Sequence, residues 1–221
     1  MFELPLFPLN LVLFPMQSLA LHVFEERYKL MIQHCIDTDS PFGVVLLEQG
    51  DAEEGRSRVE AKPRNIGCTA HISQVQKLAD GRMNIIVVGR ERFKVLEFKH
   101  DKPYFEGLVE HIPLSPTAQP IPATTIDGLN RCVTRYLQVL QKAGRVQPGK
   151  RKLPGDPLTL ASLAAVLLHD VAVSQRQSLL EAEDLGVLFE DLRSLYRREI
   201  VLLDAMLSEP QDDQIAPFSP N

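Results

Sequence analysis

The stretch Leu4–Met31, LPLFPLNLVLFPMQSLALHVFEERYKLM, decides the fold. Prolines at positions 5, 8 and 15 break its apolar runs, and proline fits neither a central strand nor a helix interior. The stretch therefore predicts short, edge-compatible strands and turns, with a strand over Ser18–Phe24. An amphipathic helix is expected to begin at Glu25, because apolar side chains follow at the spacing of a core-facing stripe.

The rest of the first half predicts further short strands. They are expected at Phe42–Leu47, Ile66–Leu78, Met83–Val88, Phe93–Phe98 and Tyr104–Ile112. Asp80-Gly81 is a hairpin signal, since these residues tolerate a positive φ. Gly89 precedes three charged residues, where a second turn or bulge would reverse the chain. Successive antiparallel strands of this kind are expected to close into a barrel-like sheet, which leaves few unpaired edges.

The second half predicts a bundle of four helices. They are expected at Thr125–Lys142, Leu158–Val173, Ser174 to about Ala182, and Asp184 to about Ser208. Asp156 is a good N-cap and Pro157 a good first helical residue. Because Leu158–Val173 is apolar on most sides, it is expected to be the central buried helix of the bundle.

These elements predict a divided chain. Residues 1–112 form a β-rich part and residues 124–208 a helical part. Between them, residues 113–123 include four prolines, which predicts a stiff, extended linker. The last residues, 209–221, hold three prolines and are expected to be a disordered tail.

Composition excludes several classes of function. The net charge of −5 opposes binding to a phosphate backbone, so nucleic acid is an unfavoured partner. The three cysteines form no CxxC pair, which favours reduced thiols and predicts no metal, cofactor or disulfide framework. No window of 18 uninterrupted apolar residues or secretory signal is present, so a cytoplasmic protein without a membrane partner is expected.

No motif predicts catalysis. Gly144–Lys150 matches the start of a phosphate-binding loop, but Arg151 stands where that loop needs Ser or Thr for Mg²⁺. His169-Asp170 resembles a metal-binding pair without the further ligands that such a site requires. We therefore expect no catalytic or metal-ligating residue and no enzymatic activity.

Apolar side chains near the first turns are the candidate binding residues: Leu9, Leu11, Phe14 and Met16. They either pack under the sheet and against the helical half, or form a hydrophobic patch for extended polypeptide. A methionine thioether would adapt to varied partners. Glu26, Arg27 and Arg92 are charged candidates beside such a patch, with structural contacts as the alternative.

Several motifs, in order, resemble the Lon N-terminal domain family, the substrate-binding module of ATP-dependent Lon proteases. They are LPLFPL at 4–9, VLFP at 12–15, LALHVFEERY at 19–28, FGV at 42–44, IGCTA at 66–70, GRERF at 89–93, Leu160-Ala161 and QSLLE at 177–181. The resemblance implies an α+β fold, in which a PUA-like antiparallel β pseudo-barrel with one helix precedes a helical bundle. Met16 departs from the glycine that many members carry after Phe-Pro.

The resemblance also implies a function. It implies non-enzymatic recognition of unfolded, damaged or extended polypeptide by a stand-alone member, because the 221 residues hold no ATPase or serine–lysine protease module. Protease machinery and a second copy of the chain are further candidate partners. The alternative is a small-ligand or RNA-binding module, since PUA-like barrels elsewhere bind nucleic acid.

Overall fold

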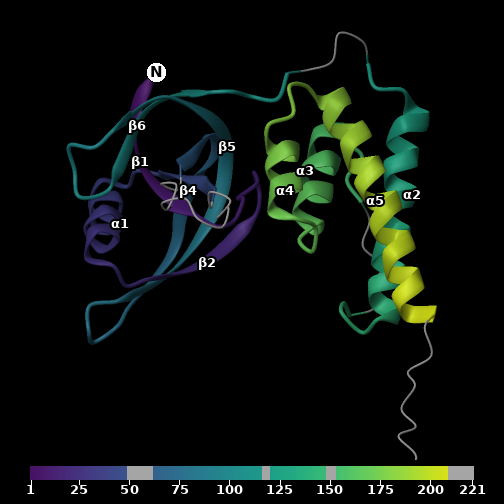
Figure 1. Ribbon diagram of the computed structural model, residues 1–221, viewed down its shortest axis with the longest axis horizontal. Helices are drawn as coiled ribbons and strands as arrows, with labels where there is room; N and C mark the ends of the chain where they lie inside the picture. The colour runs from purple at the N-terminus through teal and green to yellow at the C-terminus, as the bar shows by residue number, and fades with distance from the viewer. Residues whose placement is uncertain (49–61, 116–119, 148–152, 209–221) are drawn as a thin grey trace, which may run out of the picture.

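The computed structural model describes residues 1–48, 62–115, 120–147 and 153–208. Strands occupy the first part of the chain and a group of helices the second, as Figure 1 shows. The strands are β1 (Phe2–Leu9), β2 (Ser18–Val23), β3 (Phe42–Glu48), β4 (Lys62–Lys77), β5 (Met83–Lys99) and β6 (Phe105–His111). The helices are α1 (Glu26–Thr38), α2 (Ala123–Lys142), α3 (Pro157–Leu167), α4 (Val173–Leu180) and α5 (Leu185–Ser208).

The sheet closes on itself. Its strand order is β2-β5-β4-β3-β1-β6, and β6 returns to pair with β5. Every pairing is antiparallel except that of β1 with β3. Because the sheet closes, β1, β3, β4, β5 and β6 each pair with at least two other strands. Among the described residues, β2 pairs with β5 alone. The predicted α+β architecture, a β pseudo-barrel with one helix before a helical bundle, is confirmed, with one parallel pair added.

Strand β1 explains how prolines enter this sheet. Pro5 pairs with β6 and Pro8 with β3, and β1 changes partner at Leu6. Each proline therefore lies where β1 has a partner on one side only, the kind of edge position in which a strand tolerates proline. The prediction of short edge-compatible strands is corrected here, because β1 is eight residues long and lies between two neighbours.

Strand β5 corrects a second prediction. The expected strands Met83–Val88 and Phe93–Phe98 are one strand of 17 residues, and the chain does not reverse at Gly89. An irregularity does occur there, since the register against β4 shifts between Cys68 and Ala70. The shift bends β5, so its first half pairs with β2 and its second half with β6.

The bundle is built on the long pair α2 and α5, which Figure 1 shows side by side. The rings of Tyr136 and Tyr196 meet edge to face at 5.2 Å. Tyr196 donates its O–H to the carbonyl of Ala164 in α3 at 2.9 Å, so a buried hydroxyl is satisfied and three helices are joined. The predicted helix Leu158–Val173 is wrong at its end, because α3 stops at Leu167.

The predicted helix starts are largely confirmed. Asp156 accepts a hydrogen bond from the Thr159 N–H at 2.8 Å and caps α3, with Pro157 as its first residue. Asp184 accepts from the N–H of Val187 at 2.9 Å at the start of α5. The expectation that Ser174 caps the next helix is wrong: α4 begins at Val173, so Ser174 lies inside it and no side chain caps its start. The predicted tail and part of the predicted linker lie outside the described residues.

Candidate functional site

A tight turn joins the start of the barrel to β2. Gln17 donates its N–H to the Phe14 carbonyl at 3.1 Å, with Pro15 second and Met16 third in the turn. Met16 has a φ of 68°, the left-handed region that glycine occupies most easily. Proline followed by a positive φ is the pattern of a type II turn. The sequence therefore places a bulky side chain where the backbone favours none.

Gly89 of β5 holds this turn. Met16 donates its N–H to the Gly89 carbonyl at 2.9 Å, and Gly89 donates to the Gln17 carbonyl at 2.9 Å. A Cβ atom on Gly89 would lie 2.1 Å from the Phe14 carbonyl oxygen, so only glycine allows this approach. The bend in β5 and the turn are thus one structural feature.

The segment before the turn is shared between two cores. Leu13 packs in the barrel core with Phe7 and Met31. Its neighbours Val12 and Phe14 belong to the core of the helical bundle. Phe14 is only 3% exposed, so its ring packs against the helical half and offers little surface to a ligand.

Arg176 of α4 fastens the turn to the bundle. Its guanidinium lies 4.9 Å from the centre of the Phe14 ring and donates to the Gln17 side-chain oxygen at 3.3 Å. It also donates to the carbonyl of Leu168, just after α3. Burial lowers the Arg176 pKa, but the negative end of the α3 dipole and these carbonyls offset the cost of burying a cation.

Two more side chains join the halves. Arg92 of β5 donates to the Ala182 carbonyl at 2.8 Å and to the Ile112 carbonyl at 3.3 Å, and burial lowers its pKa. Gln177 of α4 donates to the Ile66 carbonyl of β4 at 3.0 Å. Directional hydrogen bonds from partly buried side chains across an interface fix its geometry, so barrel and bundle meet in a defined arrangement.

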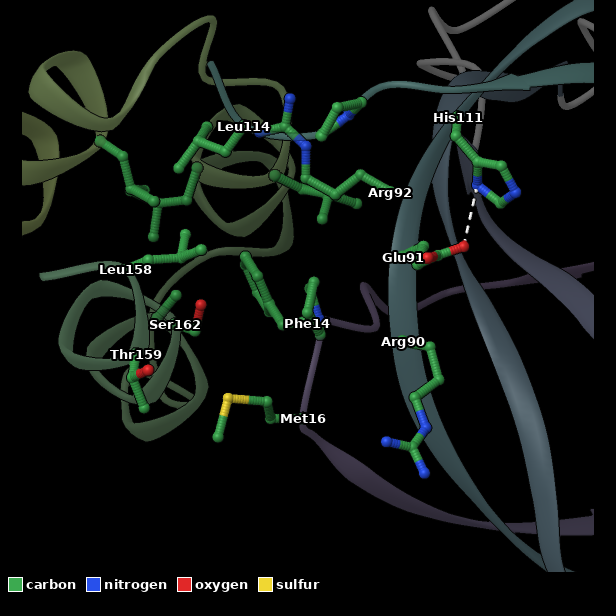
Figure 2. A pocket seen from close by; sticks show the side chains of 16 residues that line it. Phe14, Met16, Arg90, Glu91, Arg92, His111, Leu114, Leu158, Thr159 and Ser162 are labelled. Atoms are coloured by element: carbon green, nitrogen blue, oxygen red, sulfur yellow. Dashed lines mark ion pairs between the residues drawn. The ribbon is translucent and has the colours of Figure 1, made fainter. Parts of the chain in front are cut away.

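A cleft remains between the halves beside this joint. Its cavity is about 470 Å³, and Figure 2 shows its walls from the turn, β5, α3 and the segment after β6. The lining residues are Phe14, Pro15, Met16, Arg90, Glu91, Arg92, His111, Pro113, Leu114, Leu158, Thr159, Ser162, Ala165, Leu179, Leu180 and Leu188. Met16 is 58% exposed and Leu158 of α3 is 48% exposed, so large apolar side chains reach solvent at the cleft.

Charged groups occupy the barrel wall of the cleft. Glu91 and His111 lie 3.2 Å apart, and Figure 2 shows this pair on the barrel side, away from α3. Arg90 is exposed at the same wall. The bundle wall of the cleft is mainly aliphatic. The cleft therefore suits a ligand whose apolar group packs on the bundle wall and whose polar atoms face the barrel wall.

The structure brings together three of the seven predicted binding residues. Phe14, Met16 and Arg92 line the cleft. Leu9 and Leu11 pack, partly buried, against the barrel core. The remaining two are on α1, on the barrel side away from the bundle in Figure 1. There Glu26 pairs with Lys29 at 2.5 Å, and Arg27 with Glu25 at 2.8 Å.

Sequence reasoning missed Leu158, His111 and Arg176. Leu158 is the second residue of α3, after the Asp156 cap and Pro157. Its position in the first turn, ahead of the buried part of the helix, was the available signal. The contact of Arg176 with Val12 and Gln17 spans about 160 residues, and no local pattern encodes such a pairing.

The described ranges hold no group of three or more His, Cys, Asp or Glu side chains that could bind a metal ion. Burial raises the pKa of the Cys68 thiol to about 12 and that of Cys35 to about 11, so neither is a ready nucleophile. None of the helices in these ranges combines the length and apolarity needed to cross a bilayer.

Comparison with known proteins gives a consistent result. The model of the ATP-dependent protease La (LON) substrate-binding domain matches residues 3–195. Lon protease 2 of Herpetosiphon aurantiacus is 29% identical over 90% of this chain, and Lon protease of Escherichia coli K12 is 26% identical over 91%. The chain spans about a quarter of the length of these relatives, 23% and 25% respectively.

Solved structures agree with the sequence comparison. A Lon N-terminal domain protein from Xanthomonas campestris superimposes with a TM-score of 0.64 at 24% identity. It is matched over 88% of this chain and 98% of that one. The N-terminal domain of a Mycobacterium avium complex Lon protease gives a TM-score of 0.62 at 15% identity, with 89% and 98% covered. These likenesses establish the barrel-and-bundle fold.

Proposed function

Because the chain belongs to the LON substrate-binding domain family, we propose that it binds extended polypeptide in the cleft between barrel and bundle, without catalysing a reaction. The partner would be an unfolded or damaged protein, whose apolar side chains are accessible. A folded protein keeps such side chains in its core, so the chemistry of the cleft would itself select against it.

The observation that carries this proposal is the state of Met16. Its backbone adopts a φ of 68°, which costs a residue with a Cβ atom about 1–2 kcal/mol. Its side chain is 58% exposed, so packing within the chain does little to offset that cost. Backbone strain of this kind persists at ligand-binding sites, where the side chain is needed in one place. A flexible thioether at the cleft suits partners of varied sequence.

The size of the cleft supports the same function. A cavity of about 470 Å³ lies within the range of about 300–1,000 Å³ typical of ligand pockets. It would accept an apolar side chain or two, with the polypeptide backbone passing Met16. Contact through so small an area predicts weak binding, with a Kd of roughly micromolar or poorer.

Fluorescence anisotropy tests the proposal. The protein is titrated into a labelled polypeptide that stays unfolded, with a folded version of that polypeptide and a short RNA as further titrations. Saturable binding of the unfolded chain alone is expected. Met16→Ala should weaken it about tenfold, because it removes a large exposed apolar side chain from the cleft wall.

Leu30→Ala is the matched control. Leu30 is also 58% exposed, but it lies on α1, away from the cleft. Loss of binding with Met16→Ala and not with Leu30→Ala would locate the site at the cleft. Equal effects of both variants would refute that location. Absence of binding to the unfolded chain at high micromolar protein would refute polypeptide recognition, and binding of the RNA alone would favour the PUA-like alternative.

A further inference from the structure

Strand β2 has a free edge. Among the described residues it is hydrogen-bonded to β5 alone, with Leu19, Leu21 and Val23 opposite Val87, Ile85 and Met83. Figure 1 shows β2 along the lower border of the barrel. An edge of this kind presents backbone N–H and C=O groups that no neighbouring strand uses.

The register identifies which groups are free. The Gln17 carbonyl accepts from Gly89, so Gln17 points toward β5. In an antiparallel pair both backbone groups of alternate residues point the same way. Leu19 and Leu21 therefore also bond to β5, and Ser18, Ala20 and His22 present their N–H and C=O groups to the free edge.

This edge lacks the devices that normally protect an exposed strand. Natural edges are blunted by lysine, proline, bulges or inward-pointing charges. The sequence SLALHV at 18–23 contains no proline and no Lys, Arg, Asp or Glu. The residues whose backbone faces outward, Ser18, Ala20 and His22, are exposed, and the first two have small side chains. A second strand could approach without a steric or electrostatic barrier.

We propose that an extended segment of the bound polypeptide adds to β2 as a further strand. This inference rests on the proposed function and deepens it. It adds the backbone of the bound polypeptide to its apolar side chains as a recognised feature. The free edge begins at Ser18, two residues after Met16, and so continues directly from the cleft. One polypeptide could place an apolar side chain beside Met16 and its next residues along β2. Five residues of strand span about 16 Å.

The chemistry of the edge specifies this occupant. A row of backbone donors and acceptors bonds to any extended backbone, whatever its side chains. Folded proteins already use these groups in their own helices and sheets, whereas an unfolded chain has them available. Recognition through β2 would therefore tolerate varied sequences and still discriminate unfolded from folded protein, which a hydrophobic pocket achieves less completely.

The outer face beside β2 is compatible with an added strand. His22, Asn84 and Gln76 form a cross-strand row, with His22 Nδ1 and Asn84 Oδ1 2.7 Å apart. Asn84 donates to the Gln76 side-chain oxygen at 3.3 Å. The row is polar but carries no carboxylate or ammonium group, so it repels neither acidic nor basic segments. A polar side chain of the added strand would extend the row beyond His22.

Ala20→Pro tests the edge directly. The Ala20 N–H faces the free edge, so proline removes a bond to the ligand and leaves the β2–β5 ladder intact. Ala20→Val is the matched control, since it adds similar bulk, keeps the N–H and suits a strand. We expect Ala20→Pro to weaken binding of the unfolded polypeptide about five- to tenfold, and Ala20→Val to leave it within twofold.

A second measurement modifies the ligand and not the protein. Two short peptides from the bound polypeptide are methylated on the backbone nitrogens of alternate residues. One peptide is methylated at the odd-numbered positions and the other at the even-numbered positions. The apolar side chain held beside Met16 fixes which register of the peptide faces β2, so one peptide should lose binding and the other keep it. This test stands even if circular dichroism shows that Ala20→Pro does not fold.

The outcomes separate the edge from the proposed function. If wild-type protein binds no unfolded polypeptide, the proposed function itself fails. If Met16→Ala weakens binding while Ala20→Pro and both methylated peptides leave it unchanged, the cleft stands and strand addition is refuted. Sedimentation adds a further outcome: a wild-type dimer that Ala20→Pro dissociates, with no change in polypeptide binding, would assign the edge to a second copy and also overturn the inference.

Discussion

Replacing Met16 by alanine and by glycine separates the two roles that its position combines. Both variants remove the thioether, so both should lose affinity for unfolded polypeptide to the same extent. They differ only in the Cβ atom, which matters because the φ of residue 16 is 68°. Glycine occupies this region freely, and alanine does not.

The size of the difference follows from the backbone. Holding a Cβ-bearing residue at this φ costs about 1–2 kcal/mol, which glycine avoids. The greater conformational entropy of glycine in the unfolded chain cancels part of this gain in stability. Met16→Gly should therefore be more stable than Met16→Ala by about 1 kcal/mol. For a domain of this size such a gain raises Tm by about 2–4 °C. Urea unfolding followed by circular dichroism measures the free-energy difference directly.

Leu30 supplies a control of opposite sign. It has the same exposure as Met16 but lies inside α1, where glycine is about 1 kcal/mol worse than alanine. The order of stability should be glycine above alanine at position 16 and alanine above glycine at position 30. If Met16→Gly is no more stable than Met16→Ala, the turn carries no strain, and the argument that the side chain is kept for binding is refuted.

Three further outcomes are expected. Phe14→Ala should destabilise the protein by about 3–5 kcal/mol in urea unfolding, because its ring is buried against the bundle; a loss below 1 kcal/mol would contradict that packing. Gly89→Ala should lower Tm by several degrees, since its Cβ would meet the Phe14 carbonyl, and an unchanged melting curve would exclude this close approach. Cys132, which is partly exposed, should react with iodoacetamide before the buried Cys35 and Cys68. Burial raises the pKa of the Cys68 thiol, so very little of it is the reactive thiolate at pH 8, and mass spectrometry showing Cys68 labelled first would contradict its burial.

Local chemistry was enough to predict much of the fold. Asp156 followed by proline marks the start of α3, because a capping carboxylate and a preset φ act within one turn of helix. The alternating stretch before Glu25 predicts β2, whose inner residues pack on the barrel core. Such signals need no knowledge of distant partners, which explains why they could be found in the sequence.

The elements that were missed depend on distant contacts. Gly89 indicated a turn or bulge, but the sequence of β5 alone did not show that the strand continues through it, since the bend is set by the turn that packs on it. Helix α3 ends at Leu167 without a proline or glycine, and the Leu168 carbonyl instead accepts from Arg176. For the site, the sequence placed both Met16 and Phe14 near a turn, but it did not show which of the two is exposed and which is packed against the helical half.

The sharing of Val12–Phe14 between two cores has a consequence for synthesis of the chain. Val12 and Phe14 are made early, but Arg176, which contacts both, follows some 160 residues later. At about 5–20 residues per second a ribosome needs roughly 8–30 s to supply it. Until Arg176 is made, these two apolar side chains lack that contact with the bundle. The nascent chain thus exposes the kind of apolar surface that the mature cleft is proposed to recognise. Chaperones would be able to bind this surface before the helical bundle covers it.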